Sequence, residues 1–324
     1  MNNYSWLQQK LHALALSSQF IRETTFDVET TLISANQTND KHVFVAGLAR
    51  SGSTILLNAL YESNEFSSLS YQDMPFVLAP NIWSKLSQTK EDFSLIERAH
   101  GDGIKVSAKS PEAFEEVFWN TFDEEDVDIK KILKKYVGLI NHRYQKRRYL
   151  SKNNQNVRRL ELISNTFPNS AILIPFRDPI QQSYSLLSQH MRFIEASKFD
   201  TFISNYMRWI GHTEFGPNYY PIHNKNLNFE NALDINHWLE QWLLTYHSCL
   251  DALKDKKNIY FICYEQLCSS KEYWMDILKL LNIKATYDFQ FNESHKEIPI
   301  APDYRISTKG LTLYSELSNF KFRR

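Results

Sequence analysis

The sequence predicts an α/β fold in which helices cover both faces of a central parallel sheet. Short apolar runs alternate with segments of helical periodicity along the 324 residues, which is the pattern of strands joined by crossover helices. The clearest runs are apolar on both faces, as strands between two layers of helices are. We expect one domain over residues 1–324, with a helical extension at 1–40, a core at about 41–285 and a C-terminal segment at 286–324.

Three apolar runs predict strands of the sheet, at residues 43–46, 171–176 and 259–263. Residues 104–107 predict a fourth, shorter strand. Pro175 lies near the end of the second run. Because proline has no N–H to give to a neighbouring strand, we expect Pro175 where that strand leaves the sheet.

Helices are expected after these strands. Residues 54–62 follow the first strand with an apolar stripe. The helix after the second strand is predicted to begin at Asp178, with Pro179 in its first position and Gln181 placed for a capping box. Two further segments have apolar residues at helical spacing: residues 234–254 and 271–281. By contrast, the Gly- and Pro-containing residues 211–231 predict a long loop, either the wall of a binding site or a surface excursion.

The turn between the first strand and its helix has the composition of an anion-binding loop. Gly47 and Gly52 are separated by four residues, as in a Walker A loop, and this makes the expected architecture a P-loop-type three-layer fold. Gly52 lets the backbone approach an anion, and N–H groups at a helix start bind phosphate. The Walker lysine position holds Ser53, and the cation is Arg50 instead. Hydroxyl donors come from Ser51, Ser53 and Thr54.

A second anion site is predicted where the second strand ends. Arg177 follows that strand, and Ser185 lies eight residues later on the next helix. Ligands of open α/β sheets bind at the carboxyl ends of strands, where an arginine and a serine can hold a phosphate group together. Each residue alone has a simpler explanation. Arg177 could form an ion pair with Asp178 or another acid, and Ser185 could be a solvated helix residue. The pair together with the loop favours a nucleotide site.

These motifs resemble those of the PAPS-dependent sulfotransferase family, in its bacterial and tyrosylprotein-type branches. The first motif is Arg-Ser-Gly-Ser-Thr at 50–54, and the second is Arg-Asp-Pro at 177–179 with Ser185 at the family's offset. Residues 149–154 and the Tyr-Glu-Gln-Leu segment at 264–267 also follow the family's pattern. The hormone-type members have a lysine at the position of Arg50 and a catalytic histidine in a Lys-Thr-His triplet, and this chain has neither.

The resemblance implies that residues 50–54 bind the 5′-phosphosulfate of PAPS and that Arg177 and Ser185 bind its 3′-phosphate. A sulfuryl group would then move to a hydroxyl or an amine, with 3′,5′-ADP as the second product and no metal ion. Arg50 is expected to stabilise the leaving phosphate. Lys152 either shares that role or is a solvated lysine, and Tyr264 either binds the adenine end or fills the core.

The general base is predicted from position. Asp73 resembles the catalytic glutamate of the tyrosylprotein branch, and its alternative role is to cap a turn before Pro75. The competing candidates are the acids of the segment that follows Pro111, where a helix start is predicted, and one helical histidine: Glu112, Glu115, Glu116 and His190. Acids at a helix start usually stabilise the helix dipole.

Composition limits the partners. Thirty-seven basic residues balance 37 acidic ones, so no overall field attracts nucleic acid. The three cysteines and ten histidines show no disulfide or metal-ligand spacing, and no stretch reaches membrane-spanning length, which favours a cytoplasmic protein. The acceptor is expected to be a small molecule, a carbohydrate or a peptide. The alternatives are a P-loop nucleotide kinase, against which Ser53 counts, and a nucleotide-binding interaction module without activity.

Overall fold

The central sheet has five parallel strands in the order β2-β5-β1-β6-β7. The computed structural model describes residues 5–34, 40–87, 107–198, 201–223, 231–254, 256–284, 289–291, 295, 297–299 and 301–320, and the backbone alone at 96–97 and 105–106. The strands of the sheet are β1 (Val43–Val45), β2 (Phe66–Ser67), β5 (Arg148–Lys152), β6 (Ala171–Phe176) and β7 (Ile259–Cys263). The predicted fold class is confirmed, and the three predicted strands are β1, β6 and β7.

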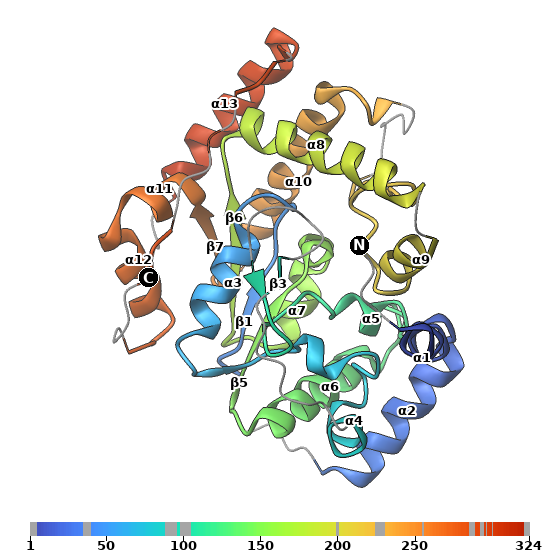
Figure 1. The fold of residues 1–324 in the computed structure, drawn as a ribbon. Helices are drawn as coiled ribbons and strands as arrows, with labels where there is room; N and C mark the ends of the chain where they lie inside the picture. The colour runs from blue at the N-terminus through green and yellow to red at the C-terminus, as the bar shows by residue number, and fades with distance from the viewer. Residues whose placement is uncertain are drawn as a thin grey trace.

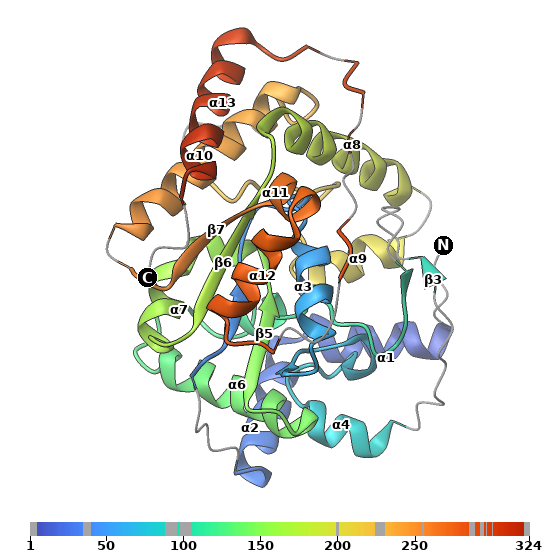
Figure 2. The same ribbon diagram turned by 90° about the vertical axis from the view of Figure 1, so that its left-hand side faces the viewer.

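Helices cover both faces of this sheet (Figures 1 and 2). One face packs against α3 (Ser53–Tyr61) and α12 (Lys271–Leu280), and the other against α6 (Ile129–Tyr144), α7 (Leu160–Thr166) and α10 (Ile235–Leu253). Successive strand residues alternate between the two layers. Val43 and Val45 join the core around α3 and α12, whereas Phe44 joins the core around α6 and α10.

The remaining elements surround these three layers. They are α1 (Trp6–Ser17), α2 (Gln19–Leu32), η1 (Tyr71–Asp73), α4 (Pro80–Leu86), α5 (Glu116–Trp119), η2 (Asn154–Arg158), α8 (Pro179–Ser197), α9 (Thr201–Trp209), α11 (Tyr264–Ser269) and α13 (Tyr304–Ser318). The Asp178 carboxylate caps α8 as predicted, accepting hydrogen bonds from the N–H groups of Ile180 and Gln181 at 3.0 and 2.8 Å. The Gln181 side chain lies 3.2 Å from His295 Nε2, so its amide contacts the C-terminal segment.

Two local predictions need correction. The short strand expected at 104–107 is present as β4 (Lys105–Val106), but it pairs antiparallel with β3 (Ile96–Glu97) in a separate hairpin and does not join the parallel sheet. The helix expected to begin after Pro111 begins at Glu116, because Pro111 forms a β-bridge with Ser70. The predicted loop is confirmed over its described residues 211–223.

Pro175 lies where β1 has already ended. The N–H of Ala171 donates to His42 O on the β1 side, and that of Ile172 donates to Asn258 O on the β7 side. Because strand residues alternate, the nitrogen of Pro175 faces β1, which ends at the pairing of Val45 with Leu173. The prediction is therefore right on the β1 side only, since β6 stays paired with β7 through Phe176.

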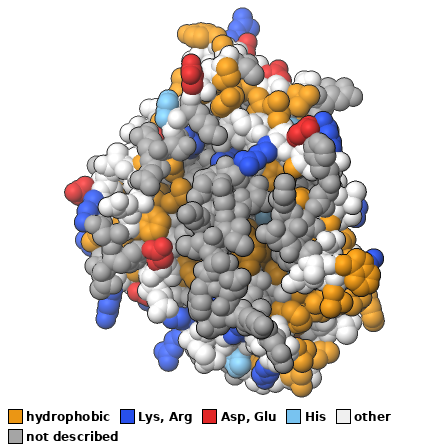
Figure 3. Space-filling model, viewed as in Figure 1, with side chains coloured by type: hydrophobic (Ala, Val, Ile, Leu, Met, Phe, Trp, Pro, Cys, Tyr) orange, Lys and Arg blue, Asp and Glu red, His pale blue; other side chains and the backbone are white. Residues whose placement is uncertain are grey.

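Charged and apolar side chains lie side by side on the face of the molecule that the space-filling view shows (Figure 3). Figure 3 shows basic, acidic and apolar side chains intermixed on one face, with apolar side chains gathered over α1. Among the described helices, none is both long and apolar enough to cross a bilayer. The described residues also contain no group of three or more His, Cys, Asp or Glu side chains that could hold a metal ion.

Candidate functional site

The anion loop, residues 47–54, connects β1 to α3 at the carboxyl end of the sheet. Gly52 is the N-cap of α3, with φ +86°, and no side chain caps this helix. A Cβ at Gly52 would lie 2.4 Å from Tyr264 Cδ2, so only glycine lets the loop pass this close to the ring. Arg50 also has a positive φ, +67°. The uncapped N–H groups at the start of α3 have the arrangement that binds phosphate in other helices.

The two predicted phosphate motifs contact each other. Arg50 Nε donates a hydrogen bond to Ser185 Oγ at 3.0 Å. Ser185 lies in the second turn of α8 and is only 4% exposed, so it is not the solvated helix residue that was its alternative. Residues 135 positions apart in the chain are thus in direct contact at the carboxyl ends of β1 and β6.

Arg177 and Tyr264 complete this group. Arg177 Cζ lies 5.1 Å from the centroid of the Tyr264 ring, the same ring that faces Gly52. Arg177 Nε is 3.9 Å from Glu265 Oε1, which is a long ion pair. The Asp178 carboxylate, the other acid considered for Arg177, caps α8 instead. The anion loop, at the carboxyl end of β1, and Arg177, at the carboxyl end of β6, therefore both contact the ring of Tyr264, which follows β7.

Gln182 holds the two motifs together and was not singled out in the sequence. Its side chain is fully buried on α8. Nε2 donates to Ala49 O at 3.0 Å, and Oε1 accepts from the backbone N–H of Arg177 at 3.2 Å and from Trp242 Nε1 at 3.0 Å. One amide thereby links the anion loop, the end of β6 and α10.

Lys152 and Asp73 occupy different surroundings. Lys152 is the last residue of β5, is buried, and lies in register with Val45, which leads into the anion loop. Asp73 is also buried, but its described contacts are with Ser70, Tyr144 and Arg143. Asp73 Oδ2 accepts from the Ser70 N–H at 2.9 Å, and Ser70 Oγ accepts from the Asp73 N–H, which together form a capping box. Ser70 Oγ also lies 3.2 Å from Asp73 Oδ2 and donates to it. Burial raises the pKa of Asp73.

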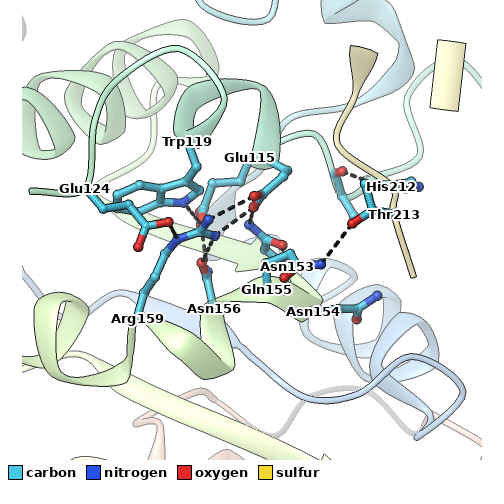
Figure 4. Close-up of polar contacts among 12 residues, drawn as sticks. Glu115, Trp119, Glu124, Asn153, Asn154, Gln155, Asn156, Arg159, His212 and Thr213 are labelled. Atoms are coloured by element: carbon cyan, nitrogen blue, oxygen red, sulfur yellow. Dashed lines mark hydrogen bonds and ion pairs between the residues drawn. The ribbon is translucent and has the colours of Figure 1, made fainter. Parts of the chain in front are cut away.

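Two of the competing acids, Glu115 and Glu116, belong to a buried polar network beyond the end of β5, part of which Figure 4 shows. Glu116 accepts from Arg159 Nη1 at 2.7 Å and Nη2 at 2.9 Å, and from Asn153 Nδ2 at 2.7 Å. Glu115 accepts from Tyr149 Oη at 2.9 Å and Asn156 Nδ2 at 2.7 Å. Glu116 neutralises the buried Arg159, and Glu115 binds β5 through Tyr149 and η2 through Asn156. Both carboxylates therefore have a structural role different from the expected stabilisation of a helix dipole.

Glu112 and His190 are also engaged in local contacts. Glu112 accepts a hydrogen bond from Tyr71 Oη at 2.7 Å. His190 Nδ1 accepts one from the Gly216 N–H at 3.2 Å, and burial lowers the His190 pKa to about 4. The neutral ring therefore anchors the 211–223 loop to α8.

A family model described as the sulfotransferase family matches residues 42–286. Among solved structures, the chain is similar to a sulfotransferase from Mycobacterium avium, at 12% identity over 100% of this chain and 82% of that one, with a TM-score of 0.49. A sulfotransferase from Mycobacterium tuberculosis H37Rv is 10% identical over 98% and 84%, with a TM-score of 0.49. The sulfotransferase domain from the curacin biosynthetic pathway is 14% identical over 87% and 99%, with a TM-score of 0.44. No curated protein matches the sequence.

Proposed function

Since the chain belongs to the sulfotransferase family, whose model matches residues 42–286, we propose that it transfers a sulfuryl group from PAPS to a hydroxyl or an amine of its acceptor. The observation that carries this proposal is the hydrogen bond between Arg50 and Ser185, 3.0 Å long. This hydrogen bond joins the two motifs. We propose that the two motifs bind opposite ends of one nucleotide that carries two phosphate groups.

The residues of the site fit such a nucleotide. The start of α3 lacks a side-chain cap, and at Gly52 a Cβ would fill the space beside Tyr264. This end suits the 5′-phosphosulfate, with Arg50 as its cation. Arg177 and Ser185 would hold the 3′-phosphate, since a guanidinium and a hydroxyl are both donors to phosphate oxygens. Tyr264, between Gly52 and Arg177, would contact the nucleoside.

Catalysis by these residues would consist mainly of positioning and charge stabilisation. The acceptor oxygen or nitrogen forms a bond to sulfur as the bond from sulfur to the 5′-phosphate oxygen breaks, and 3′,5′-ADP leaves. Arg50 and Lys152 would stabilise the negative charge that grows on this phosphate. Two cations and the N–H groups of α3 support transfer without a metal ion, because a sulfuryl group carries less charge than a phosphoryl group.

Arg177→Ala tests the nucleotide assignment. Loss of a charge-assisted contact is expected to weaken 3′,5′-ADP binding by about 2–3 kcal/mol, which is roughly 30- to 150-fold. Isothermal titration without magnesium measures it, and transfer of labelled sulfate from PAPS to a panel of alcohols, phenols, sugars and amines measures activity. The control is Arg147→Ala, which removes an exposed arginine. Unchanged affinity in Arg177→Ala, or magnesium-dependent ATP binding that ignores a 3′-phosphate, would contradict the proposal.

Asp73 is proposed as the base that takes the acceptor proton, and Asp73→Asn tests it. Asparagine also caps turns, so the melting temperature and 3′,5′-ADP affinity should stay close to those of the native chain. The value of kcat should fall by about 100-fold. Because burial raises the pKa of Asp73, the native rate should increase with pH as this carboxyl loses its proton, and the variant should lack that rise. A variant that melts earlier but keeps the native kcat per folded molecule would leave Asp73 as a turn cap only.

A further inference from the structure

A cavity of about 440 Å³ lies between the N-terminal helices, α5, η2 and the segment from α9 into the 211–223 loop. Its volume is within the range of about 300–1,000 Å³ that small-molecule sites occupy. Its walls include Arg22, Arg158, Arg208, Trp209 and Tyr220. None of these residues belongs to the nucleotide site proposed above.

The cavity wall carries positive charge that has no ion-paired carboxylate in the described part of the chain, and the one acid that acts on Arg22 electrostatically is its neighbour Glu23. Among the described residues, no carboxylate forms an ion pair with Arg22, Arg158 or Arg208. Arg208 Nη2 donates to the neutral amide of Asn205 at 3.1 Å. Glu116 also lines the cavity, but its carboxylate already accepts two hydrogen bonds from Arg159, at 2.7 and 2.9 Å. A chain with equal numbers of basic and acidic residues thus presents three guanidinium groups to one cavity.

Arg22 adds a buried cation. It is 9% exposed, and its donors are bonded to neutral acceptors: Leu16 O, Asn120 O at 3.0 Å and Thr121 Oγ1 at 2.7 Å. These bonds orient the guanidinium without neutralising it. Burial correspondingly lowers the pKa of Arg22. A charge held in this way gains stability when an anion enters the cavity.

The other wall is aromatic. Trp209 is the last residue of α9, and Tyr220 lies in the 211–223 loop with 47% of its surface exposed. Both residues line the cavity. Aromatic rings that line a pocket beside cations, here the half-buried Trp209 and the exposed Tyr220, accept the flat apolar body of an organic ligand. Because inorganic ions would use only the arginines, the combination favours an acid with an apolar or aromatic body.

We infer that this cavity binds a small organic acid, with its carboxylate, sulfate or phosphate group at Arg158 and Arg208 in the field of Arg22 and its apolar body against Trp209 and Tyr220. The inference does not depend on the proposed function. Such an acid can come from two sources, the acceptor itself or a separate ligand. Gln155, which lines the cavity, lies only three residues beyond Lys152 at the nucleotide edge of the sheet.

Benzoate and its neutral isostere benzamide provide the test. We expect benzoate to bind the native protein about ten-fold more tightly than benzamide, as measured by ligand-observed NMR titration. The double variant Arg158→Gln/Arg208→Gln should lose this preference. Both arginines are exposed, so the fold should be retained, which the melting temperature checks. The control is Lys130→Gln/Lys134→Gln, which removes two exposed cations of α6 and should keep the preference.

Equal binding of benzoate and benzamide, no binding of either, or a preference that survives in the arginine variant would overturn the inference. The benzoate titration is run with and without 3′,5′-ADP. Because the titration without the nucleotide depends on the cavity alone, loss of 3′,5′-ADP binding and loss of benzoate binding are separate results. Kinetics with the best acceptor of the panel then distinguish the two sources of the acid. A KM raised in the arginine variant, with benzoate competitive against the acceptor, identifies the acceptor's own acid group, and an unchanged KM identifies a separate acid.

Discussion

Replacing Gly52 with alanine is expected to weaken the binding of 3′,5′-ADP by about 2–3 kcal/mol. The residue has φ +86°, a conformation that costs an L-residue about 1–2 kcal/mol. The added Cβ would also lie 2.4 Å from Tyr264 Cδ2 and 3.0 Å from Cε2, so the ring or the loop must move.

The displaced ring links this change to the second phosphate site. The Arg177 guanidinium lies over the Tyr264 ring, and moving the ring removes a contact worth about 1 kcal/mol. Together with the backbone strain, we expect a loss of about 2–3 kcal/mol of nucleotide affinity, roughly 30- to 150-fold in Kd. The overall fold should persist, because the strain falls on one turn.

Isothermal titration with 3′,5′-ADP measures the effect, and the melting temperature reports the fold. Gly138→Ala is the matched control, since Gly138 lies inside α6 and alanine is favoured over glycine within a helix. Native affinity in Gly52→Ala would mean that the turn before α3 does not hold the nucleotide.

The fold class and the nucleotide end of the site were predictable because both depend on local patterns. The anion loop and the segment from Arg177 to Ser185 each lie within one strand–turn–helix unit, so residue spacing alone indicates which side chains share an edge of the sheet. The rule that parallel strands end on one edge then brings these two units together, and the Arg50–Ser185 hydrogen bond is the observed result.

The unpredicted features depend on partners distant in sequence. β5 carries Arg148, Ser151 and Lys152, which weaken its apolar pattern, and its partner β1 lies about a hundred residues earlier. The cap of Asp73 needs Ser70, but its further contacts come from Arg143 and Tyr144 on α6. Spacing in the sequence contains no information about such long-range pairs.

The buried acids show the same limit. Glu115 and Glu116 stand in a short acidic segment, where the helix dipole was the expected partner. Their actual partners are Arg159, Asn153 and Asn156 beyond β5. A buried carboxylate needs such donors, but a single sequence does not identify which ones fold against it.

Gln182→Leu is expected to cause the largest loss of stability among the site variants. Leucine has nearly the volume of glutamine, so packing is retained while the five hydrogen bonds of the Gln182 side chain disappear, the three shortest of which join Arg177, Trp242 and Ala49. The N–H of Arg177, Nε1 of Trp242 and the carbonyl of Ala49 then lack this partner in a buried position. At about 1–3 kcal/mol for each unsatisfied group, we expect a loss of about 4 kcal/mol in the free energy of unfolding.

A variant on the same helix separates this effect from a general intolerance of α8 to substitution. Gln189 is also buried, and its Nε2 has no hydrogen-bond partner in the described structure. Gln189→Leu should therefore change the free energy of unfolding by less than about 1 kcal/mol. Urea denaturation followed by circular dichroism compares the two variants. Equal losses would show that the Gln182 contacts contribute nothing specific.

Gln182→Glu tests whether the same amide also positions the nucleotide site. The carboxylate keeps the acceptors for Trp242 and Arg177, but it replaces the donor to Ala49 O with a negative oxygen. If Gln182 fixes the span between the anion loop and Arg177, affinity for 3′,5′-ADP should fall by about ten-fold or more under conditions where the variant is fully folded. The reason for this expectation is that two phosphate sites that bind one nucleotide must keep a fixed separation. A variant that is less stable but binds 3′,5′-ADP as tightly as the native chain would show that Gln182 stabilises the core only.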